Sequence, residues 1–310
     1  MELSVNAVMR RGILRLSTHR GTAAWMRRYG MRLGAARFVA GETLDGCVAV
    51  LRRLTDLGFE TNTTLLGESV DDAATAAAIA NEYLGVLDRL ARESLPTRLA
   101  VKLTHLGLNV GEDLAYDNVA RLVERAAAHG QFVRMDMEES ARVDPTLRIY
   151  RRLLAAGHAN VGTVLQAYLY RTERDLEALL PLRPNLRLVK GAYLEPPDVA
   201  FPKKVDVDHN LVSLITRSLR EGGYTAIATH DDHVIDQALA FATEHQIPRD
   251  RYELQMLYGV RPQLQRDLLA RGERVMVATP FGAEWYPYFM RRLAERPANV
   301  LFFVRNLMRR

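Results

Sequence analysis

From about residue 59 onward, short runs rich in β-branched and aromatic residues alternate with longer stretches whose apolar residues recur three and four apart. The short runs predict eight strands, at 60–66, 99–103, 132–137, 161–168, 186–191, 224–229, 252–257 and 274–278. Helical spacing is clearest at 71–93, 117–129 and 232–245. Strands and helices that alternate in this rhythm are typical of parallel β/α units. Eight such units predict a closed (β/α)8 barrel of the TIM type.

A doubly wound open sheet is the alternative architecture. No G-x-G-x-x-G motif follows the first predicted strand, so in that fold a dinucleotide would have to be held in some other way. We therefore prefer the barrel. The domain prediction is a basic N-terminal segment of helices at 1–45, followed by the barrel at 46–310.

Charge is distributed unevenly along the 310 residues. The first 37 carry eight arginines against Glu2 alone, so this segment has a net charge of +7 and the rest −2, for a total of +5. Such a segment is typical of an amphipathic surface helix, a transit peptide or an RNA-binding arm. We favour helices in peripheral contact with an anionic membrane, and consider a merely solvated basic face about equally compatible. No apolar run reaches membrane-spanning length, and the single Cys47 excludes internal disulfides and suits a reducing cytoplasm.

The last helical segment carries the most distinctive pattern of charges. Tyr288, Arg291, Arg292 and Glu295 stand at i, i+3, i+4 and i+7, so in a helix they share one face. Two adjacent guanidiniums bind a carboxylate or phosphate in a bidentate manner that lysines do not match. An Arg-Arg pair alone is more often a solvated helix face, but this one follows the eighth strand of the predicted barrel.

Polar and ionisable residues gather where the predicted strands end. They are Glu68, Lys102, Thr104, Asp136, Glu138, Gln166, Tyr168, Arg187, Lys190, Tyr193, Thr229, His230, Asp231, Gln255 and Tyr258. In a barrel the C-terminal strand ends hold the active site. An ionisable group in an apolar strand is costly unless it is paired or functional. The largely cationic set predicts an anionic ligand, and no His, Asp or Glu cluster has the spacing of metal ligands.

Six runs of residues resemble those of proline dehydrogenases. They are VKLT at 101–104, VRMDME at 133–138, GTVLQAY at 162–168, RLVKGAY at 187–193, ATHD at 228–231 and YFMRRLAE at 288–295. Each motif is weak alone, but six in the right order are specific, and the similarity extends over about 37–307. The chain is identified as a member of this family, of the monofunctional bacterial type without an aldehyde dehydrogenase half. The resemblance implies a distorted (β/α)8 barrel with FAD across the C-terminal strand ends.

The resemblance also implies the reaction and its substrate contacts. L-proline is oxidised to 1-pyrroline-5-carboxylate as a hydride passes from ring C5 to flavin N5. Arg291, Arg292 and Lys102 match the residues that hold the substrate carboxylate. Arg187 matches an arginine near flavin N5, where a fixed cation favours the reduced flavin. Asp136 matches a catalytic aspartate, which we expect to orient Lys102 and other neighbours.

Further positions match the contacts of the cofactor. They are Met137, Gln166, Lys190, Gly191, Ala192, Thr229 and His230, with Lys204 placed to reach the pyrophosphate. Glycine suits position 191, where the backbone approaches the cofactor closely. Arg187 and Lys190 are three residues apart, so both serve the flavin only if a bulge or a strand end intervenes.

Two features concern access to the site. Glu68 matches a glutamate that pairs with the clamp Arg291 when the site is empty, and Tyr288 and Glu295 are expected to support the grip of the arginines. The family implies a membrane quinone as electron acceptor, which fits a cytoplasmic enzyme peripheral to the inner membrane face.

The eighth strand departs from the family pattern. Relatives have a tyrosine two residues before the proline, whereas this chain has Ala278 before Pro280. Either a neighbour such as Tyr258 fills the space, or the widened pocket tolerates 4-hydroxyproline. We prefer proline with relaxed discrimination. Outside this family, a barrel aldolase would use Lys102 or Lys190 as a Schiff-base amine. A nucleic-acid-binding role for the N-terminal arginines does not account for the ordered set of polar residues at the strand ends.

Overall fold

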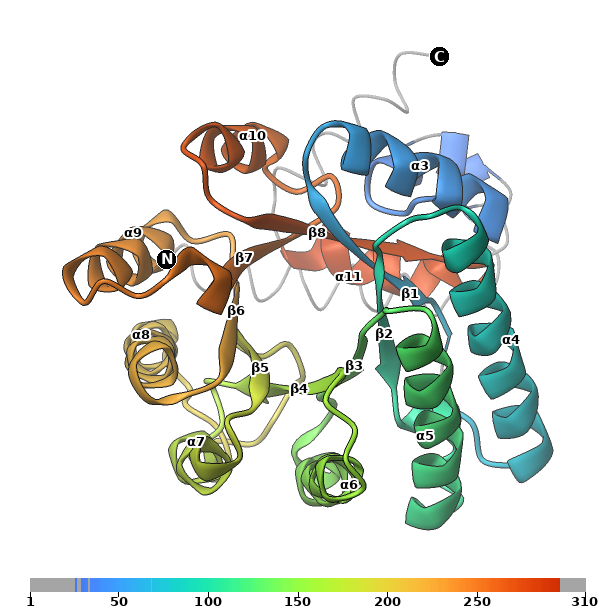
Figure 1. Cartoon of the computed structure of the whole chain (residues 1–310), viewed down its shortest axis with the longest axis horizontal. Helices are drawn as coiled ribbons and strands as arrows, with labels where there is room; N and C mark the ends of the chain where they lie inside the picture. The colour runs from blue at the N-terminus through green and yellow to red at the C-terminus, as the bar shows by residue number, and fades with distance from the viewer. Residues whose placement is uncertain (1–25, 27–28, 33, 68, 296–310) are drawn as a thin grey trace.

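The computed structural model describes residues 26, 29–32, 34–67 and 69–295. Eight parallel strands form a closed barrel in the order of the sequence, and β8 pairs with β1 (Figure 1). The strands are β1 (Glu60–Leu65), β2 (Arg98–Lys102), β3 (Val133–Asp136), β4 (Val161–Gln166), β5 (Asn185–Val189), β6 (Tyr224–Ala228), β7 (Tyr252–Leu257) and β8 (Val275–Phe281). The closed barrel confirms the prediction and excludes the doubly wound open sheet.

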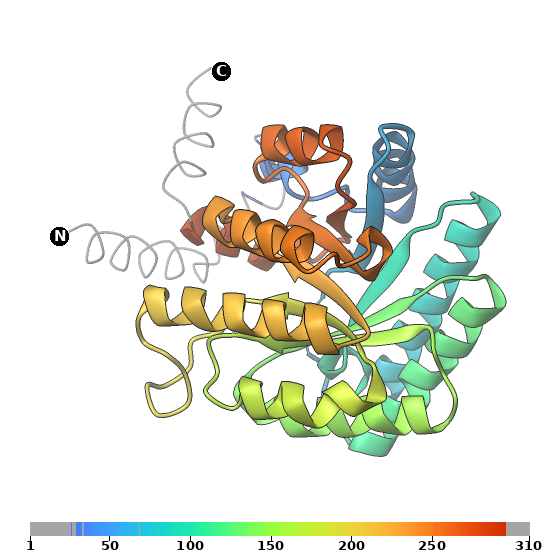
Figure 2. The same cartoon turned by 60° about the vertical axis from the view of Figure 1, so that its left-hand side comes forward.

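Helices surround the barrel. They are α3 (Leu44–Asp56), α4 (Ala73–Arg92), α5 (Glu112–Ala128), α6 (Val143–Ala155), α7 (Thr172–Leu179), α8 (Lys204–Glu221), α9 (Asp232–Glu244), α10 (Pro262–Ala270) and α11 (Trp285–Glu295). Short 3-10 helices lie at η1 (Ala35–Arg37), η2 (Thr104–Leu106), η3 (Ser140–Arg142), η4 (Leu180–Leu182) and η5 (Arg249–Arg251). Figure 2 shows α7, α8 and α9 along the outer side of β4 to β7. Local sequence fixes several starts; for α4, the Asp72 side chain accepts a hydrogen bond from Thr75 N at 2.8 Å.

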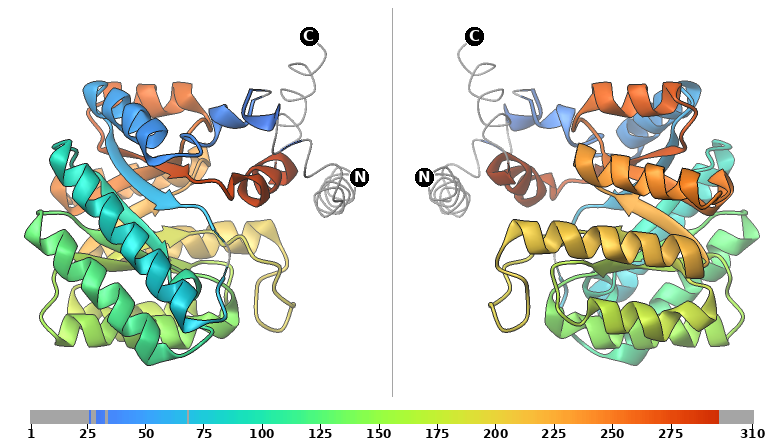
Figure 3. Two further views of the ribbon diagram at one scale, coloured as in Figure 1. Left: turned by 90° about the vertical axis from the view of Figure 1, so that its right-hand side faces the viewer. Right: turned by 90° about the vertical axis from the view of Figure 1, so that its left-hand side faces the viewer.

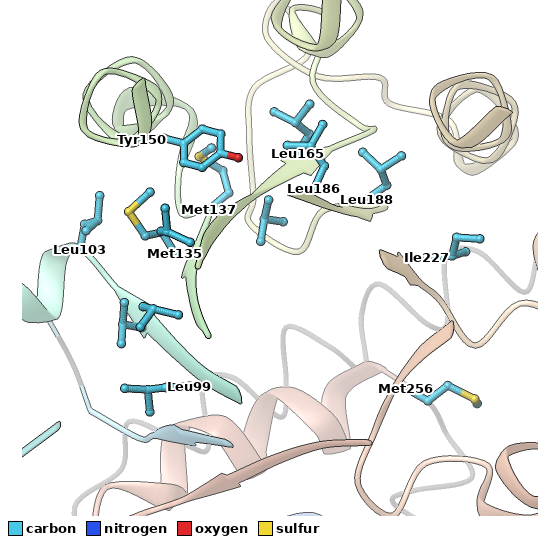
Figure 4. Close-up of a cluster of buried hydrophobic side chains, with 14 of the residues drawn as sticks. Leu99, Leu103, Met135, Met137, Tyr150, Leu165, Leu186, Leu188, Ile227 and Met256 are labelled. Atoms are coloured by element: carbon cyan, nitrogen blue, oxygen red, sulfur yellow. The ribbon is translucent and has the colours of Figure 1, made fainter. Parts of the chain in front are cut away.

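Alternate residues of each strand form the hydrophobic core. Leu99, Met135, Leu186 and Ile227 are buried between the strands and the helices (Figure 4). Because strand side chains alternate between faces, the intervening residues point to the inside of the barrel. Many of these inward-pointing residues are polar or charged, so the ionisable groups of the strands lie inside the barrel.

The lower interior, near the start of the strands, contains a compact ion network. Arg98 bonds Glu60 at 2.9 Å and Glu253 at 2.8 Å, and Arg274 bonds Glu60 at 2.7 Å. Glu253 is completely buried and also accepts a hydrogen bond from Gln255 Nε2 at 2.6 Å. We call Glu60, Arg98, Glu253 and Arg274 the floor network. Burial would raise the pKa of Glu253, but the charge of Arg98 and the bond from Gln255 hold it below its ordinary value.

Helix α11 does not occupy the outer position that follows β8 in a regular barrel. Helix α3 packs there instead, against β8 and β1, and the buried Cys47 of α3 contacts the outward hydroxyl of Thr63 at 3.3 Å. Figures 1 and 3 show α11 across the end of the barrel where the strands finish. This exchange is the distortion of the barrel, and it brings the arginines of α11 over the strand ends.

Three strand ends differ from the prediction by two or more residues. β4 ends at Gln166 because the chain turns there, and the Gln166 carbonyl accepts from Thr172 Oγ1 at 2.5 Å. β5 ends at Val189, two residues before Gly191, whose φ of 111° does not continue a strand. β8 continues to Phe281 through Pro280, which lacks an N–H but whose carbonyl accepts from Ala40 N at 2.8 Å. The division at residue 45 stays a prediction.

Candidate functional site

Arg187 and Asp136 form the central ion pair of the strand-end face. Asp136 is the last residue of β3, and Arg187 points inward from β5. Arg187 Nη1 donates to Asp136 Oδ1 at 2.7 Å, with side chains 12% and 24% exposed. Lys102, the last residue of β2, is the register neighbour of Asp136. The sequence therefore places all three side chains in one layer of the barrel interior.

This layer contains hydrogen-bonding groups that no protein group satisfies. Nε and Nη2 of Arg187 are buried without a partner among the described residues, and so is Oε1 of the buried Gln166. Buried polar groups are rarely left unsatisfied, so unpaired donors beside an unpaired acceptor indicate a ligand with complementary edges. A flavin ring has carbonyl and ring-nitrogen acceptors and an N–H donor. The residues present therefore fit such a cofactor.

The turn after β5 approaches its neighbours closely. A Cβ at position 191 would lie 2.1 Å from the ring of Tyr168, so only glycine fits between that ring and the turn. Tyr168 N donates to Lys190 O at 2.8 Å, which holds the turn against the end of β4. Ala192 is exposed directly after it. Arg187 and Lys190 are three residues apart and would point to opposite faces of a continuous strand. Because β5 ends at Val189, the alternation does not apply to Lys190, and both side chains can face one ligand.

Two lysines and two aspartates form a second cluster beyond β5 and β6. Lys190 Nζ lies 2.7 Å from Asp231 Oδ2 and 2.5 Å from Asp208 Oδ1. Lys204 at the start of α8 pairs with Asp208 and lies 3.3 Å from Asp231. Asp208 was not among the predicted residues, although its i+4 spacing from Lys204 is the sequence signal for this pair. Asp231 therefore pairs with the two lysines of this cluster.

His230 is fixed by backbone groups. Leu257 N donates to His230 Nε2 at 2.9 Å, and Arg261 Nη1 donates to the His230 carbonyl at 2.8 Å. Because Nε2 accepts a hydrogen bond, we assign the ring proton to Nδ1. Thr229 Oγ1 accepts from Asp231 N at 3.2 Å. This loop therefore presents fixed polar groups after β6.

Helix α11 carries the predicted clamp. Tyr288, Arg291 and Arg292 lie within it, and the Arg292 guanidinium stands 5.1 Å from the centre of the Tyr288 ring. Arg291 reaches the strand-end face: burial raises the pKa of Tyr193, as do nearby carboxylates that include Asp136, whereas the charge of Arg291 lowers it. Arg291 of α11 and Asp136 of β3 thus both lie close enough to Tyr193 to affect its pKa. Glu68 and the side chain of Glu295 lie outside the described residues.

The N-terminal segment supports α11. Met26, Phe38 and Val39 form a second buried cluster with α11 residues that include Trp285, which is fully buried. Trp285 Nε1 donates to Glu42 Oε1 at 2.7 Å. The sequence identified this segment by its charge, but its described part contributes packing beneath the clamp.

Lys102 lies beside a buried carboxylate. Glu138 Oε1 accepts from Thr104 Oγ1 at 2.6 Å and Oε2 accepts from Thr104 N at 3.1 Å. Burial raises the pKa of Glu138, against the bonds from Thr104 and the charge of Lys102. Burial and the charge of Lys102 lower the pKa of His105 to about 4. These contacts fix the loop that follows β2, and Met137 is buried beside Glu138.

The residue of β8 that departs from the family pattern, Ala278, faces the inside of the barrel. Ala278 is the register partner of Leu257 on β7 and of Asn62 on β1. The hydroxyl of Tyr258 accepts a hydrogen bond from Arg53 on the outer helix α3 at 2.9 Å. Tyr258 is thus directed to the outer layer rather than toward Ala278, which disfavours the interpretation that it replaces the missing phenol.

The described part of the chain contains neither a metal-binding cluster nor a membrane-spanning helix. No three or more His, Cys, Asp or Glu side chains there are grouped so that they could hold a metal ion. None of its helices combines the length and apolar character that a membrane crossing requires.

Known proteins resemble this chain over nearly its full length. The family model for proline dehydrogenase matches residues 47–305. "Proline dehydrogenase 1" of Bacillus subtilis is 40% identical over 98% of this chain and 100% of that protein. "Proline dehydrogenase" of Deinococcus radiodurans is 42% identical over 89% of this chain and 90% of its own.

The solved structures agree on the fold. Proline utilization A from Bdellovibrio bacteriovorus, inactivated by N-propargylglycine, superposes with a TM-score of 0.81 at 23% identity, over 88% of this chain and 33% of that one. The family model and the two bacterial relatives carry the assignment further than fold. The chain belongs to the proline dehydrogenase family, oxidoreductases of proline catabolism for which a flavin cofactor is implied.

Proposed function

We propose that this protein binds FAD and oxidises L-proline to 1-pyrroline-5-carboxylate, the first step of proline catabolism. The observation that carries the proposal is the half-satisfied Arg187, which Asp136 holds through Nη1 while Nε and Nη2 are buried without a partner among the described residues. FAD, when bound, supplies a ring that accepts a hydride at N5. In this oxidation the C5–H bond of proline breaks, a C5=N bond forms, and the ring nitrogen releases a proton.

The substrate is held by its carboxylate. Arg291 and Arg292 lie on α11, which crosses the end of the barrel where the strands finish, and Lys102 is the last residue of β2. Three cations around one carboxylate fix the orientation of the proline ring, which makes the transfer from C5 an oriented intramolecular step. Tyr288 supports the grip through its stacking with Arg292. Asp136 fixes the guanidinium of Arg187 and is a poor base for a secondary ammonium.

The cofactor is held by the ends of β3 to β6. Gln166 and Arg187 offer an acceptor and donors to the ring, and His230, whose Nε2 accepts from Leu257 N, is a further contact. The remaining contacts come from Met137, Lys190, Gly191, Ala192, Lys204 and Thr229. The 68% exposed Lys204 side chain suits the pyrophosphate, with Asp208 and Asp231 holding both lysines in place.

The electron acceptor is a membrane quinone, reached through peripheral contact of the basic N-terminus at the cytoplasmic face. Glu68 closes the empty site by pairing with Arg291. The membrane contact is tested by sedimentation with vesicles of anionic lipid. Variants that lack the first arginines are expected to lose binding to these vesicles. The pairing of Glu68 with Arg291 is tested by Glu68→Ala, which should strengthen proline binding, because no carboxylate then competes with the substrate for Arg291.

A second substrate has support from one observation. Ala278 faces the interior, and Tyr258 is bonded to Arg53 and so does not fill the space. We therefore propose that the protein prefers proline but also oxidises 4-hydroxyproline. A Schiff-base aldolase is less compatible with the site, because Lys190 is engaged by two carboxylates.

The flavin spectrum of the purified protein tests the main proposal. We expect a yellow protein whose absorbance bleaches on anaerobic addition of L-proline and recovers with a quinone. The mass of the cofactor released by denaturation distinguishes FAD from FMN. A colourless protein that borohydride traps covalently with a carbonyl substrate would support the aldolase instead.

A further inference from the structure

Arg134 is a second buried arginine inside the barrel, one layer below the Asp136–Arg187 pair. Its side chain is among the largest fully buried ones, with 1% exposure. Nη1 donates to the carbonyls of Thr163 at 3.1 Å and Asn185 at 3.0 Å, and Nη2 donates to Asn185 Oδ1 at 2.6 Å. The guanidinium thus bridges from β3 to β4 and β5.

The neighbouring strand is adapted to this side chain. Gly162 of β4 is the register partner of Arg134. A Cβ at position 162 would lie 2.6 Å from Arg134 Nη1 and 2.6 Å from the Asn185 carbonyl. The ring of Phe132 packs against the guanidinium, with its centre 5.0 Å away. Glycine at 162 therefore makes the room that the guanidinium occupies.

The charge of Arg134 is balanced differently from that of Arg98. Arg98 contacts the carboxylates of Glu60 and Glu253, whereas the hydrogen-bond partners of Arg134 among the described residues are neutral amide groups. Burial, and next the charge of Arg187, lowers the pKa of Arg134 to about 9, so the side chain stays protonated at neutral pH. A cation is thus retained beneath Arg187 without a carboxylate in contact.

We propose that Arg134 is a positioning residue of the flavin site that also sets the flavin's reduction potential. This inference rests on the proposed flavin-dependent function. The fork of Arg134 aligns β3, β4 and β5, which carry Asp136, Gln166 and Arg187. Its charge adds to that of Arg187 and stabilises the negative charge that reduction brings to the ring. The floor network below does not add to this potential, because its arginines face carboxylates.

The test is a potentiometric titration of the intact, flavin-loaded enzyme. R134Q removes the charge but keeps an amide donor for the carbonyls, and R134K keeps the charge without the fork. R251M is the matched control, because Arg251 also donates to backbone carbonyls, those of Gly222 and Gly223, but lies where β7 begins. We expect R134Q to shift the two-electron equilibrium about tenfold toward the oxidised flavin, roughly 30 mV. R134K and R251M should stay within about threefold of the wild type.

Each other outcome is decisive. An unchanged potential in flavin-loaded R134Q, or an equal shift in R251M, overturns the inference while leaving the proposed function intact. A wild-type protein that holds no flavin overturns both. Should R134Q not fold, R134K provides the second test, because a lysine keeps the charge but cannot bridge the carbonyls of Thr163 and Asn185. The flavin affinity of R134K should then fall severalfold at an unchanged potential, and a wild-type affinity in R134K overturns the inference.

Discussion

The two ends of the barrel interior use the same residue types in opposite ways. At the floor, Arg98 is bonded to Glu60 and Glu253, and the carboxylates are shared with further donors. At the strand ends, Arg187 is bonded to Asp136 through one nitrogen only, and its other donors face no protein acceptor among the described residues. Arginine donors that are bonded to carboxylates hold the barrel together, whereas the unpaired donors of Arg187 prepare it for a ligand.

This contrast shows why the presence of a buried arginine is a poor guide to function. Both arginines lie on strands, point inward and are largely buried. The cost of burying a charge must be offset in either case, by protein groups or by a ligand. The unpaired donors of Arg187, which have no counterpart in Arg98, separate the roles of these two arginines among the described residues.

The largest effect that this comparison predicts is a loss of stability at the floor. E253Q removes a fully buried carboxylate and leaves part of the charge of Arg98 uncompensated. We expect a decrease of about 3–5 kcal/mol in the free energy of unfolding, measured by urea denaturation. The kcat of the remaining folded enzyme should be unchanged. A large drop in kcat with normal stability would contradict the assignment of stability to the floor and catalysis to the strand ends.

The strand-end counterpart is R187M. This substitution removes the donors that face the proposed flavin, and we expect kcat to fall about 100- to 1,000-fold, as for the loss of one preorganised electrostatic contact. The measurement is anaerobic flavin reduction by proline in a stopped-flow experiment. R98M is the matched control at the floor, which should lose stability but reduce its flavin at the normal rate. Equal losses of rate in both variants would contradict the assignment.

The fold was predictable because its signals are local. Alternating apolar positions in strands and three-to-four spacing in helices are repeated eight times, and parallel β/α units of this number close into a barrel. The exchange of α3 and α11 was not readable from any local pattern. It depends on packing between the segment around Phe38 and the buried face of α11, which are some 250 residues apart.

The site was predictable as a set of residues but not as a set of contacts. Lys190 and Lys204 were recognised as cations near the cofactor, yet their pairing with Asp208 and Asp231 joins three separate segments. Likewise, Asp136 was expected to orient Lys102 and other neighbours, but the sequence did not identify Arg187 as the neighbour that it bonds in the structure. Residue type and strand position follow from sequence, but partner choice depends on the relative rotation of neighbouring strands.

Substrate discrimination provides a smaller effect at the upper layer. A278Y adds a phenol on the wall formed with Leu257 and Asn62, and we expect it to lower the ratio of kcat/KM for 4-hydroxyproline to that for proline by about 10- to 200-fold. A Y258F variant is the control, because the hydroxyl of Tyr258 is directed to Arg53. If wild-type enzyme already rejects hydroxyproline strongly, the widened pocket is wrong.

The smallest predicted effect concerns the lysine cluster, which combines features of both ends: its charges are paired, yet it lies in contact with solvent at the strand ends. Burial alone would raise the pKa of Asp231, but the hydrogen bond and charge of Lys190, with those of Lys204, lower it to about 2. A lowered folded-state pKa contributes stability that is fully present above about pH 4 and is lost as the pH falls toward 2. Because solvent screens the pairs, we expect a contribution of only about 1 kcal/mol.

D231N should therefore remove about 1 kcal/mol of the stability that wild-type protein loses between pH 4 and pH 2, measured as urea midpoints across that range. D236N is the control, because Asp236 is an exposed carboxylate on the same helix, α9. Parallel pH profiles for wild type and D231N would mean that the pairing with Lys190 is too weak to stabilise the empty protein. The cluster would then belong with the unsatisfied charges of the strand ends, held ready for a pyrophosphate rather than for the fold.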